Sequence, residues 1–451
     1  MQNKYHLIAI GGSVMHNVAI DLAEMSNEIT GSDDEIYEPS KSRLLAKGLL
    51  PDKMGWDSSR INSDIDAIIL GKHAKKDNPE LLKAQELGLP IYSFPEFVTS
   101  RSNAQKRVCI SGSHGKTSTT AMIMHVLRLL GYDFDYLVGA NLEGFDKMVK
   151  LSHSDILIVE GDEYPSSCLD DKAKMLHYKP NIAVITGMAW DHVNIYKTYD
   201  AYKDIFRSFL NGLNTDSVCY YDQSDVELNH MVLNESFPPK RISYKALDLN
   251  KKGEIEFGDE KYPVKIFGNH NMLNLKAAFN VCKELGVPTE QFFKCIASFT
   301  GAAKRLELVS ENENLIVYKD FAHAPSKCKA TVEAIRSRFP AKKVKALLEL
   351  HTFSSLDTAF IPQYKDTMDE ADKAFVFFDP HAMQMKNMPL LDTEEVCKHF
   401  NHKDMLVFDN KDMFKDEILA SKHDGTEVLL VMSSGGLGGL NLEESFKIKK
   451  N

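Results

Sequence analysis

The sequence lacks features that are typical of membrane proteins, disulfide-rich proteins and nucleic-acid-binding proteins. Its apolar runs are strand-sized and do not reach the roughly 20 apolar residues that a membrane-spanning helix needs. The seven cysteines are scattered and include no C-x-x-C pair, which argues against a disulfide framework and a zinc site. Lys and Arg number 54 against 64 Asp and Glu, giving a net charge of −10. Non-specific binding to nucleic acid or to an anionic membrane is therefore disfavoured.

The sequence also shows no internal repeat and no low-complexity segment. The stretch "MQNKYHLIAIGG" passes directly into a predicted strand, so we expect no signal peptide. Together with the scattered cysteines, this predicts a cytoplasmic protein with reduced thiols. The length of 451 residues allows about two to four domains.

Short apolar runs alternate with helical and polar stretches along the chain, which predicts an α/β protein built from three units. Residues 1–104 contain the strand-like runs "HLIAI" and "AIILG". Residues 105–300 contain "VCISGSHGKT", "DILIVEGDEY" and "NIAVITGMAWDH". Residues 301–451 contain "LIVYKDFAHAPS", "KVKALLEL" and "EVLLVMSSGGLGG". We therefore predict three α/β domains with these boundaries.

The segment "SGSHGKTSTT", residues 111–120, has the chemistry of a phosphate-binding loop that opens a helix. Gly112 and Gly115 allow successive amides to turn toward one point, and the helix N-terminus adds its unpaired amides. Lys116 can reach terminal phosphates, and the Thr117 hydroxyl can bind Mg²⁺. Ile110 stands where the longer pattern has its first glycine, so the motif is the shorter G-x-x-G-K-T. The loop predicts phosphate binding but does not separate a kinase, a motor, a switch and a ligase.

Acidic residues follow two further predicted strands. "ILIVEGDEY" ends with Glu160, Asp162 and Glu163, and "AVITGMAWDH" ends with Asp191 and His192. Carboxylates at strand ends beside a phosphate loop are well placed to hold magnesium or its water ligands. At this point a structural role and a metal-ligand role for His192 are about equally supported.

The N-terminal unit carries a weaker nucleotide signal. Gly11 and Gly12 follow the first predicted strand, and Asp33 ends the second. That spacing is about the spacing of an acidic ribose contact in dinucleotide-binding folds. The glycines depart from G-x-G-x-x-G, so a structural turn stays an alternative.

Three further polar clusters are weak signals when each is taken alone. They lie in "GNHNMLN", "GAAKRLE" and "KDFAHAPS" and supply His270, Asn271, Asn274, Lys304, Arg305, Asp320 and His323. The first cluster is also explained by a helix cap. The basic pair of the second could contact phosphate or be solvated.

Taken together and in this order, the motifs resemble the Mur ligase family over nearly the whole chain. The set comprises the phosphate loop, the acidic strand end, D-H, N-H-N-x-x-N, R-L-E and D-x-A-H-x-P. The resemblance implies an N-terminal Rossmann-like domain for a UDP-sugar, a central P-loop ATPase-like domain and a C-terminal Rossmann-like domain. It also implies that ATP phosphorylates a substrate carboxylate and that an amine attacks the acyl phosphate. The products would be an amide, ADP and phosphate, and the cofactors would be ATP and Mg²⁺.

The resemblance further implies roles for individual residues. The catalytic set would be Lys116, Glu160 and His192, with Thr117 binding one Mg²⁺ and the Glu160–His192 pair a second. Asp320 would bind the ATP ribose from the third domain, so that domain closure would complete the site. The implied ATP contacts are Gly112, Ser113, His114, Gly115, Lys116, Thr117, Ser118, His270, Asn274, Arg305 and Asp320. The implied UDP-sugar contacts are Gly12, Ser13, Ser32, Asp33 and His73.

Some segments resemble particular branches of the family. "GGSVMH", "GSDDEIYEPS" and "GKHAKKDNPEL" resemble the members that use UDP-N-acetylmuramate as carboxylate donor. The stretch "DDKAKMLHYKP", residues 170–180, resembles the members that attach a recovered peptidoglycan tripeptide. Lys172, Lys174 and His323 would then contact this acceptor, whose carboxylates lysines attract. The alternatives are L-alanine as acceptor in de novo synthesis, a P-loop kinase or NTPase, and a nucleotide-binding module.

Two departures from the family pattern bear on this interpretation. Gly187 stands where many relatives have asparagine before the D-H motif, which removes one expected polar contact. The stretch "LELHTFSS", residues 348–355, lacks an arginine that the relatives of both branches carry. We therefore expect recognition of the amine substrate to differ from theirs.

Overall fold

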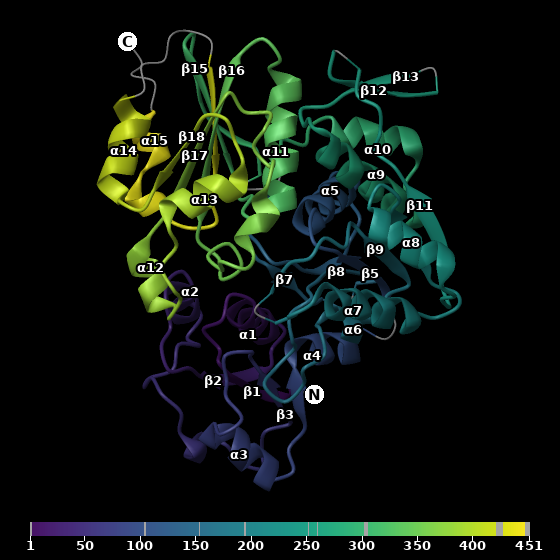
Figure 1. Cartoon of the computed structure of the whole chain (residues 1–451). Helices are drawn as coiled ribbons and strands as arrows, with labels where there is room; N and C mark the ends of the chain where they lie inside the picture. The colour runs from purple at the N-terminus through teal and green to yellow at the C-terminus, as the bar shows by residue number, and fades with distance from the viewer. Residues whose placement is uncertain are drawn as a thin grey trace.

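The computed structural model describes residues 2–102, 105–152, 154–193, 195–250, 252–258, 260–301, 305–420 and 427–446. Helices alternate with mostly parallel strands in these residues, which confirms the α/β class (Figure 1). Each of the three larger sheets falls within one of the three predicted domain ranges, and the exact boundaries stay a prediction. Within the described residues, no helix combines the length and apolar character needed to cross a membrane.

The N-terminal sheet is parallel and has the strand order β2-β1-β3-β4. Its inner strands β1 and β3 are buried because helices or loops cover both faces, as parallel sheets require. The parallel order brings the carboxyl ends of β1, β2 and β3 to one edge. Its elements are β1 (Lys4–Ile8), α1 (Met15–Glu24), β2 (Glu28–Ser32), α2 (Ser40–Ala46), η1 (Ser58–Arg60), β3 (Ala67–Leu70), α3 (Pro79–Glu86), β4 (Ile91–Ser93) and α4 (Phe94–Arg101).

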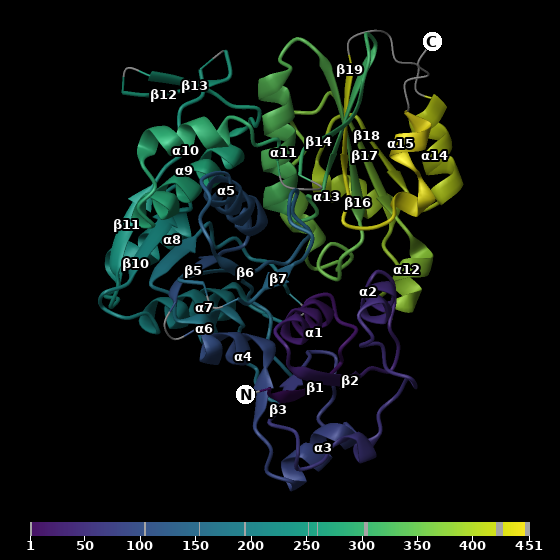
Figure 2. The ribbon, with the colours of Figure 1, turned by 180° about the vertical axis from the view of Figure 1, so that it is seen from behind.

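The central sheet has the order β11-β10-β9-β5-β8-β6-β7, with β5 between β9 and β8. This order sets the phosphate loop after β5 directly between the two acidic strand ends. A separate hairpin, β12–β13, lies at the outer end of this domain (Figures 1 and 2). The elements are β5 (Lys106–Ser111), α5 (Lys116–Leu129), β6 (Asp135–Leu137), β7 (Val149–Lys150), β8 (Ile156–Gly161), α6 (Met175–Tyr178), β9 (Ile182–Ile185), α7 (Tyr199–Asn211), β10 (Val218–Asp222), α8 (Val226–Asn234), β11 (Lys240–Tyr244), β12 (Glu254–Phe257), β13 (Glu260–Pro263), α9 (Asn269–Glu284) and α10 (Thr289–Ile296).

The C-terminal sheet has the order β14-β15-β19-β16-β17-β18 and is parallel except for β14. Helix α11 leaves β15 and lies on the side that faces the central domain (Figure 2). The elements are β14 (Glu307–Glu311), β15 (Leu315–Asp320), α11 (Pro325–Arg338), β16 (Lys343–Leu350), η2 (Ile361–Tyr364), β17 (Lys373–Phe378), α12 (Pro380–Met385), α13 (Thr393–Phe400), β18 (Met405–Phe408), α14 (Lys411–Ala420), β19 (Glu427–Met432), η3 (Leu437–Gly439) and α15 (Leu442–Ser445).

The three parts are joined in two different ways. One apolar cluster runs through the N-terminal and central domains, where α1 also accepts backbone hydrogen bonds: Leu151 N–H donates to Asp21 at 2.7 Å. The C-terminal domain has apolar clusters of its own. Its helix α11 packs on α9 of the central domain. A cavity lies at the interface between the central and C-terminal domains.

Candidate active site

The phosphate loop has the geometry that its glycines predict. It joins β5 to α5 through Gly112, with φ of 119°, and Gly115, with φ of 75°. A Cβ on Gly115 would lie 2.1 Å from Asn274 Oδ1, so this position has no room for a side chain. The Gly187 carbonyl accepts from Ser113 N–H at 3.0 Å. The glycine that departs from the family pattern therefore supports the loop through its backbone.

Lys116, the first residue of α5 after this loop, is held in its charged form. Its Nζ lies 3.0 Å from Glu163 Oε2 and also donates to the Gly112 carbonyl. Burial acts to lower the pKa of Lys116, but the carboxylates of Glu163 and Asp162 outweigh it and raise that pKa above its usual value. The sequence placed Glu163 among the carboxylates that could hold magnesium, but it did not predict the ion pair of Glu163 with Lys116.

Hard oxygen ligands gather beside the loop. The Thr117 hydroxyl donates to Glu160 at 3.0 Å, and Gly139 N–H donates to the same carboxylate at 3.2 Å. Burial raises the pKa of Glu160, so a cation placed there would stabilise its ionised form. His192 Nε2 lies 3.9 Å from Glu163 Oε2. Oxygens of this kind suit Mg²⁺, and the predicted sharing of one ion by Glu160 and His192 stays a prediction.

A cavity of about 190 Å³ opens between the central and C-terminal domains. All the predicted ATP contacts except Gly112 line this cavity. They are Ser113, His114, Gly115, Lys116, Thr117, Ser118, His270, Asn274, Arg305 and Asp320. The Asp320 carboxylate accepts from Leu306 N–H and Ala322 N–H, each at 2.7 Å, which fixes it at the end of β15. Lys304 lies outside the described residues. The cavity thus brings together motifs that are about 200 residues apart in the sequence.

The predicted UDP-sugar contacts divide into two groups. Gly12, Ser13, Asp33 and His73 lie at the carboxyl edge of the N-terminal sheet. Asp33 Oδ2 accepts from Gly11 N–H at 2.7 Å, and burial raises the pKa of Asp33 to about 6. The Ser32 side chain is different, because it is buried and its hydroxyl donates to the buried Glu80. Its predicted sugar contact would have to compete with that interaction.

The predicted acceptor contacts are spread over two elements. Lys172 is exposed, whereas Lys174 is half-buried and donates to Asp162 at 2.9 Å. His323 follows β15, its Nδ1 lies 2.8 Å from the Phe321 carbonyl, and burial lowers its pKa to about 4. Sequence reasoning missed Lys72, whose Nζ lies 3.8 Å from the Tyr164 ring centre beside this loop.

The chain matches known proteins along most of its length. The profile described as "Mur ligase family, catalytic domain" matches residues 4–106, and "Mur ligase middle domain" matches residues 110–282. The UDP-N-acetylmuramate–L-alanine ligase of Caldicellulosiruptor bescii is 31% identical over 93% of this chain and 95% of that protein. The chain belongs to the Mur ligase family. It is an ATP-dependent ligase that forms C–N bonds.

Two other relatives carry the name of the peptide-using branch. The UDP-N-acetylmuramate–L-alanyl-γ-D-glutamyl-meso-2,6-diaminoheptanedioate ligase of Escherichia coli is 25% identical over 97% of this chain and 96% of that protein. The crystal structure of a murein peptide ligase from Psychrobacter arcticus superposes with a TM-score of 0.66, with 19% identity and full coverage of both chains. This likeness shows that the chain has the fold of the Mur ligases.

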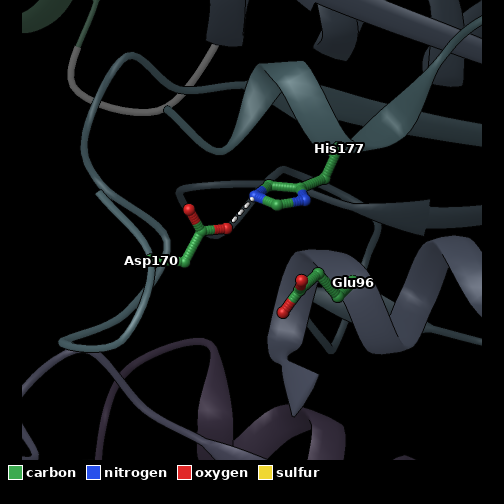
Figure 3. A group of neighbouring side chains, drawn as sticks. All are labelled: Glu96, Asp170 and His177. Atoms are coloured by element: carbon green, nitrogen blue, oxygen red, sulfur yellow. Dashed lines mark ion pairs between the residues drawn. The ribbon is translucent and has the colours of Figure 1, made fainter. Parts of the chain in front are cut away.

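In this Mur ligase, an ion pair joins the loop after β8 to helix α6. Asp170 of the loop lies 2.9 Å from His177 Nε2 on α6, and Glu96 on α4 is close to both (Figure 3). The Glu96 carboxylate accepts from the backbone N–H of Ser93 in a capping box. The Asp170–His177 pair therefore helps to hold the loop segment that carries Lys172 and Lys174.

Proposed function

We propose that this ligase joins the carboxylate of UDP-N-acetylmuramate to the amine of L-alanyl-γ-D-glutamyl-meso-diaminopimelate, the tripeptide recovered from peptidoglycan. The observation that carries the reaction type is the cavity between two domains, in which Lys116 of the phosphate loop and Asp320 of β15 line the same space. Lys116 supplies a cation for phosphate, and the Thr117 hydroxyl with its partner Glu160 supplies oxygens for magnesium.

The chemistry assigns a task to each group. A free carboxylate is a poor electrophile, because its leaving group would be oxide, and phosphorylation provides a good leaving group. ATP and the carboxylate are both anions, so Lys116 offsets their repulsion during transfer. Thr117 and Glu160 would hold Mg²⁺, which supplies further charge neutralisation. Asp320 and His270 would position the nucleotide from the opposite side of the cavity.

The tripeptide is favoured by the cations near the loop after β8. Lys72, Lys174 and the exposed Lys172 lie on or beside this loop, and the pKa of Lys72 is lowered by burial and by the nearby Lys174. Repulsion among lysines is relieved by an anionic ligand. The tripeptide carries several carboxylates, whereas L-alanine carries one and needs only a small pocket.

L-alanine is the second candidate acceptor. A specific observation favours it: the Caldicellulosiruptor bescii relative, which is 31% identical, is named an L-alanine ligase. In that case the enzyme would act in de novo peptidoglycan synthesis rather than in recycling.

A phosphate-release assay tests the proposal. ATP, Mg²⁺ and UDP-N-acetylmuramate are held constant, and the tripeptide, L-alanine or no amine is added. We expect sustained phosphate release only with an amine, and faster release with the tripeptide. Equal release without UDP-N-acetylmuramate would reject the donor and would favour a P-loop NTPase.

A further inference from the structure

Helix α11 brings a lysine from the C-terminal domain into the phosphate cavity. Lys327 lies in the first turn of α11, and its side chain is 17% exposed. It lines the same cavity as Lys116 and Arg305. Its Nζ lies 3.3 Å from Asp191 Oδ2 in the central domain. An ion pair thus joins the two domains at the edge of the phosphate loop.

Three cations, Lys116, Arg305 and Lys327, line the cavity together with the carboxylates of Asp222 and Asp320. Burial lowers the pKa of Lys327, and Asp191 opposes this effect while Lys116 and Arg305 add to it. Asp191 is itself buried, and Lys327 is the leading cause that holds its pKa below the usual range against burial. Buried cations that face one cavity repel one another, and an anion placed among them lowers that repulsion.

We propose that Lys327 is a catalytic residue that binds the terminal phosphate of ATP from the C-terminal domain, opposite Lys116. In the structure Asp191 holds the ammonium group at the cavity wall. When the nucleotide enters, the ammonium group exchanges Asp191 for a phosphate oxygen. The contact makes affinity depend on the terminal phosphate, so that Lys327 contributes to ATP binding more than to ADP binding. This inference rests on the proposed ATP-dependent function.

Nucleotide binding by the full-length protein tests this assignment. We would measure the affinity for ADP and for a non-hydrolysable ATP analogue, both with Mg²⁺, by calorimetry. Lys327→Met should weaken binding of the analogue by about tenfold, the value of one charge-assisted contact, and change ADP binding by much less. Lys329→Met is the matched control, because Lys329 lies in the same helix and is exposed. It should leave both affinities unchanged.

Two outcomes would overturn the assignment. Equal losses for ADP and the analogue, or no loss for either, would mean that Lys327 only pairs with Asp191 in the interface. If Lys327→Met does not fold, the double variant Lys327→Met/Asp191→Asn removes the unpaired charge and should show the same selective loss. The proposed function fails separately, if the wild-type protein binds neither nucleotide or forms no amide product.

Discussion

The phosphate loop of this Mur ligase and the loop after β8, which we propose contacts the acceptor, differ in what their charged groups contact. At the phosphate loop beside the cavity, the motif residues contact one another: Lys116 pairs with Glu163, and Thr117 donates to Glu160. Along the loop after β8, Lys174 pairs with Asp162 while Lys172 is exposed. The nucleotide site is therefore a compact unit, whereas the groups predicted to recognise the amine are shared with contacts that hold the fold.

This difference between the two loops indicates where specificity for the amine substrate can change in this fold. A phosphate group needs several converging donors in one place, and the β5–α5 turn supplies them from consecutive residues. A peptide acceptor needs charges spread over its length, which separate segments can supply. Lys72, Lys174 and His323 lie in three different predicted domains, so no single segment supplies the proposed acceptor contacts.

The largest expected effect is at the phosphate loop. Lys116→Ala should lower amide formation by on the order of 10²-fold or more, because one cation facing the transferring phosphate contributes several kcal/mol. The variant also leaves Glu163 unpaired, so rates are compared well below its melting temperature. Near-normal turnover would mean that Lys116 does not face the transferring phosphate and that the phosphate loop is not the site of transfer.

The next effect is at the D-H motif. His192→Ala should slow the reaction by about 10- to 100-fold and raise the magnesium concentration needed for half-maximal rate, since a metal-site contact is lost. Phosphate release measured across a magnesium series checks this. A variant that loses rate with an unchanged magnesium requirement would argue for a structural role of His192 beside Glu163.

A pH effect tests His323, which was predicted to contact the acceptor and lies half-buried near Lys327 and Asp191. Its pKa of about 4 is below the usual 6.5, so the folded protein holds it neutral while the unfolded chain protonates below pH 6.5. Stability is therefore fully present above pH 6.5 and is lost as the pH falls toward 4, by about 2 kcal/mol at pH 5. The melting temperature should fall from pH 7 to pH 5, and fall less in His323→Asn. An equal fall in both proteins would contradict this source of pH dependence.

The smallest expected effect separates the two lysines of the loop. Lys172→Ala should raise KM for the tripeptide a few-fold with little change in melting temperature, because an exposed charge is worth at most about 1 kcal/mol. Lys174→Ala should raise KM and also lower the melting temperature, because Asp162 loses its partner. Binding of UDP-N-acetylmuramate should be unchanged in Lys172→Ala. An unchanged KM in both variants would remove the loop from acceptor recognition.

The sequence was sufficient for those features that depend on local chain geometry. The two glycines and Lys116 predict the loop, and parallel strands bring Glu160 and Asp191 to the same sheet edge wherever they lie in the sequence. Partners that depend on packing between distant segments were not predictable. The Ser32 hydroxyl turns to Glu80, and Lys327 reaches Asp191 only because α11 packs on the central domain.

The most direct test of the account is a competition for the amine. The enzyme is given ATP, Mg²⁺ and UDP-N-acetylmuramate with equal concentrations of the tripeptide and L-alanine, and the two amide products are counted by mass spectrometry. The product ratio equals the ratio of kcat/KM values for the two acceptors. The account predicts a large excess of the tripeptide product. An excess of the L-alanine product would contradict it and would identify a ligase of de novo peptidoglycan synthesis.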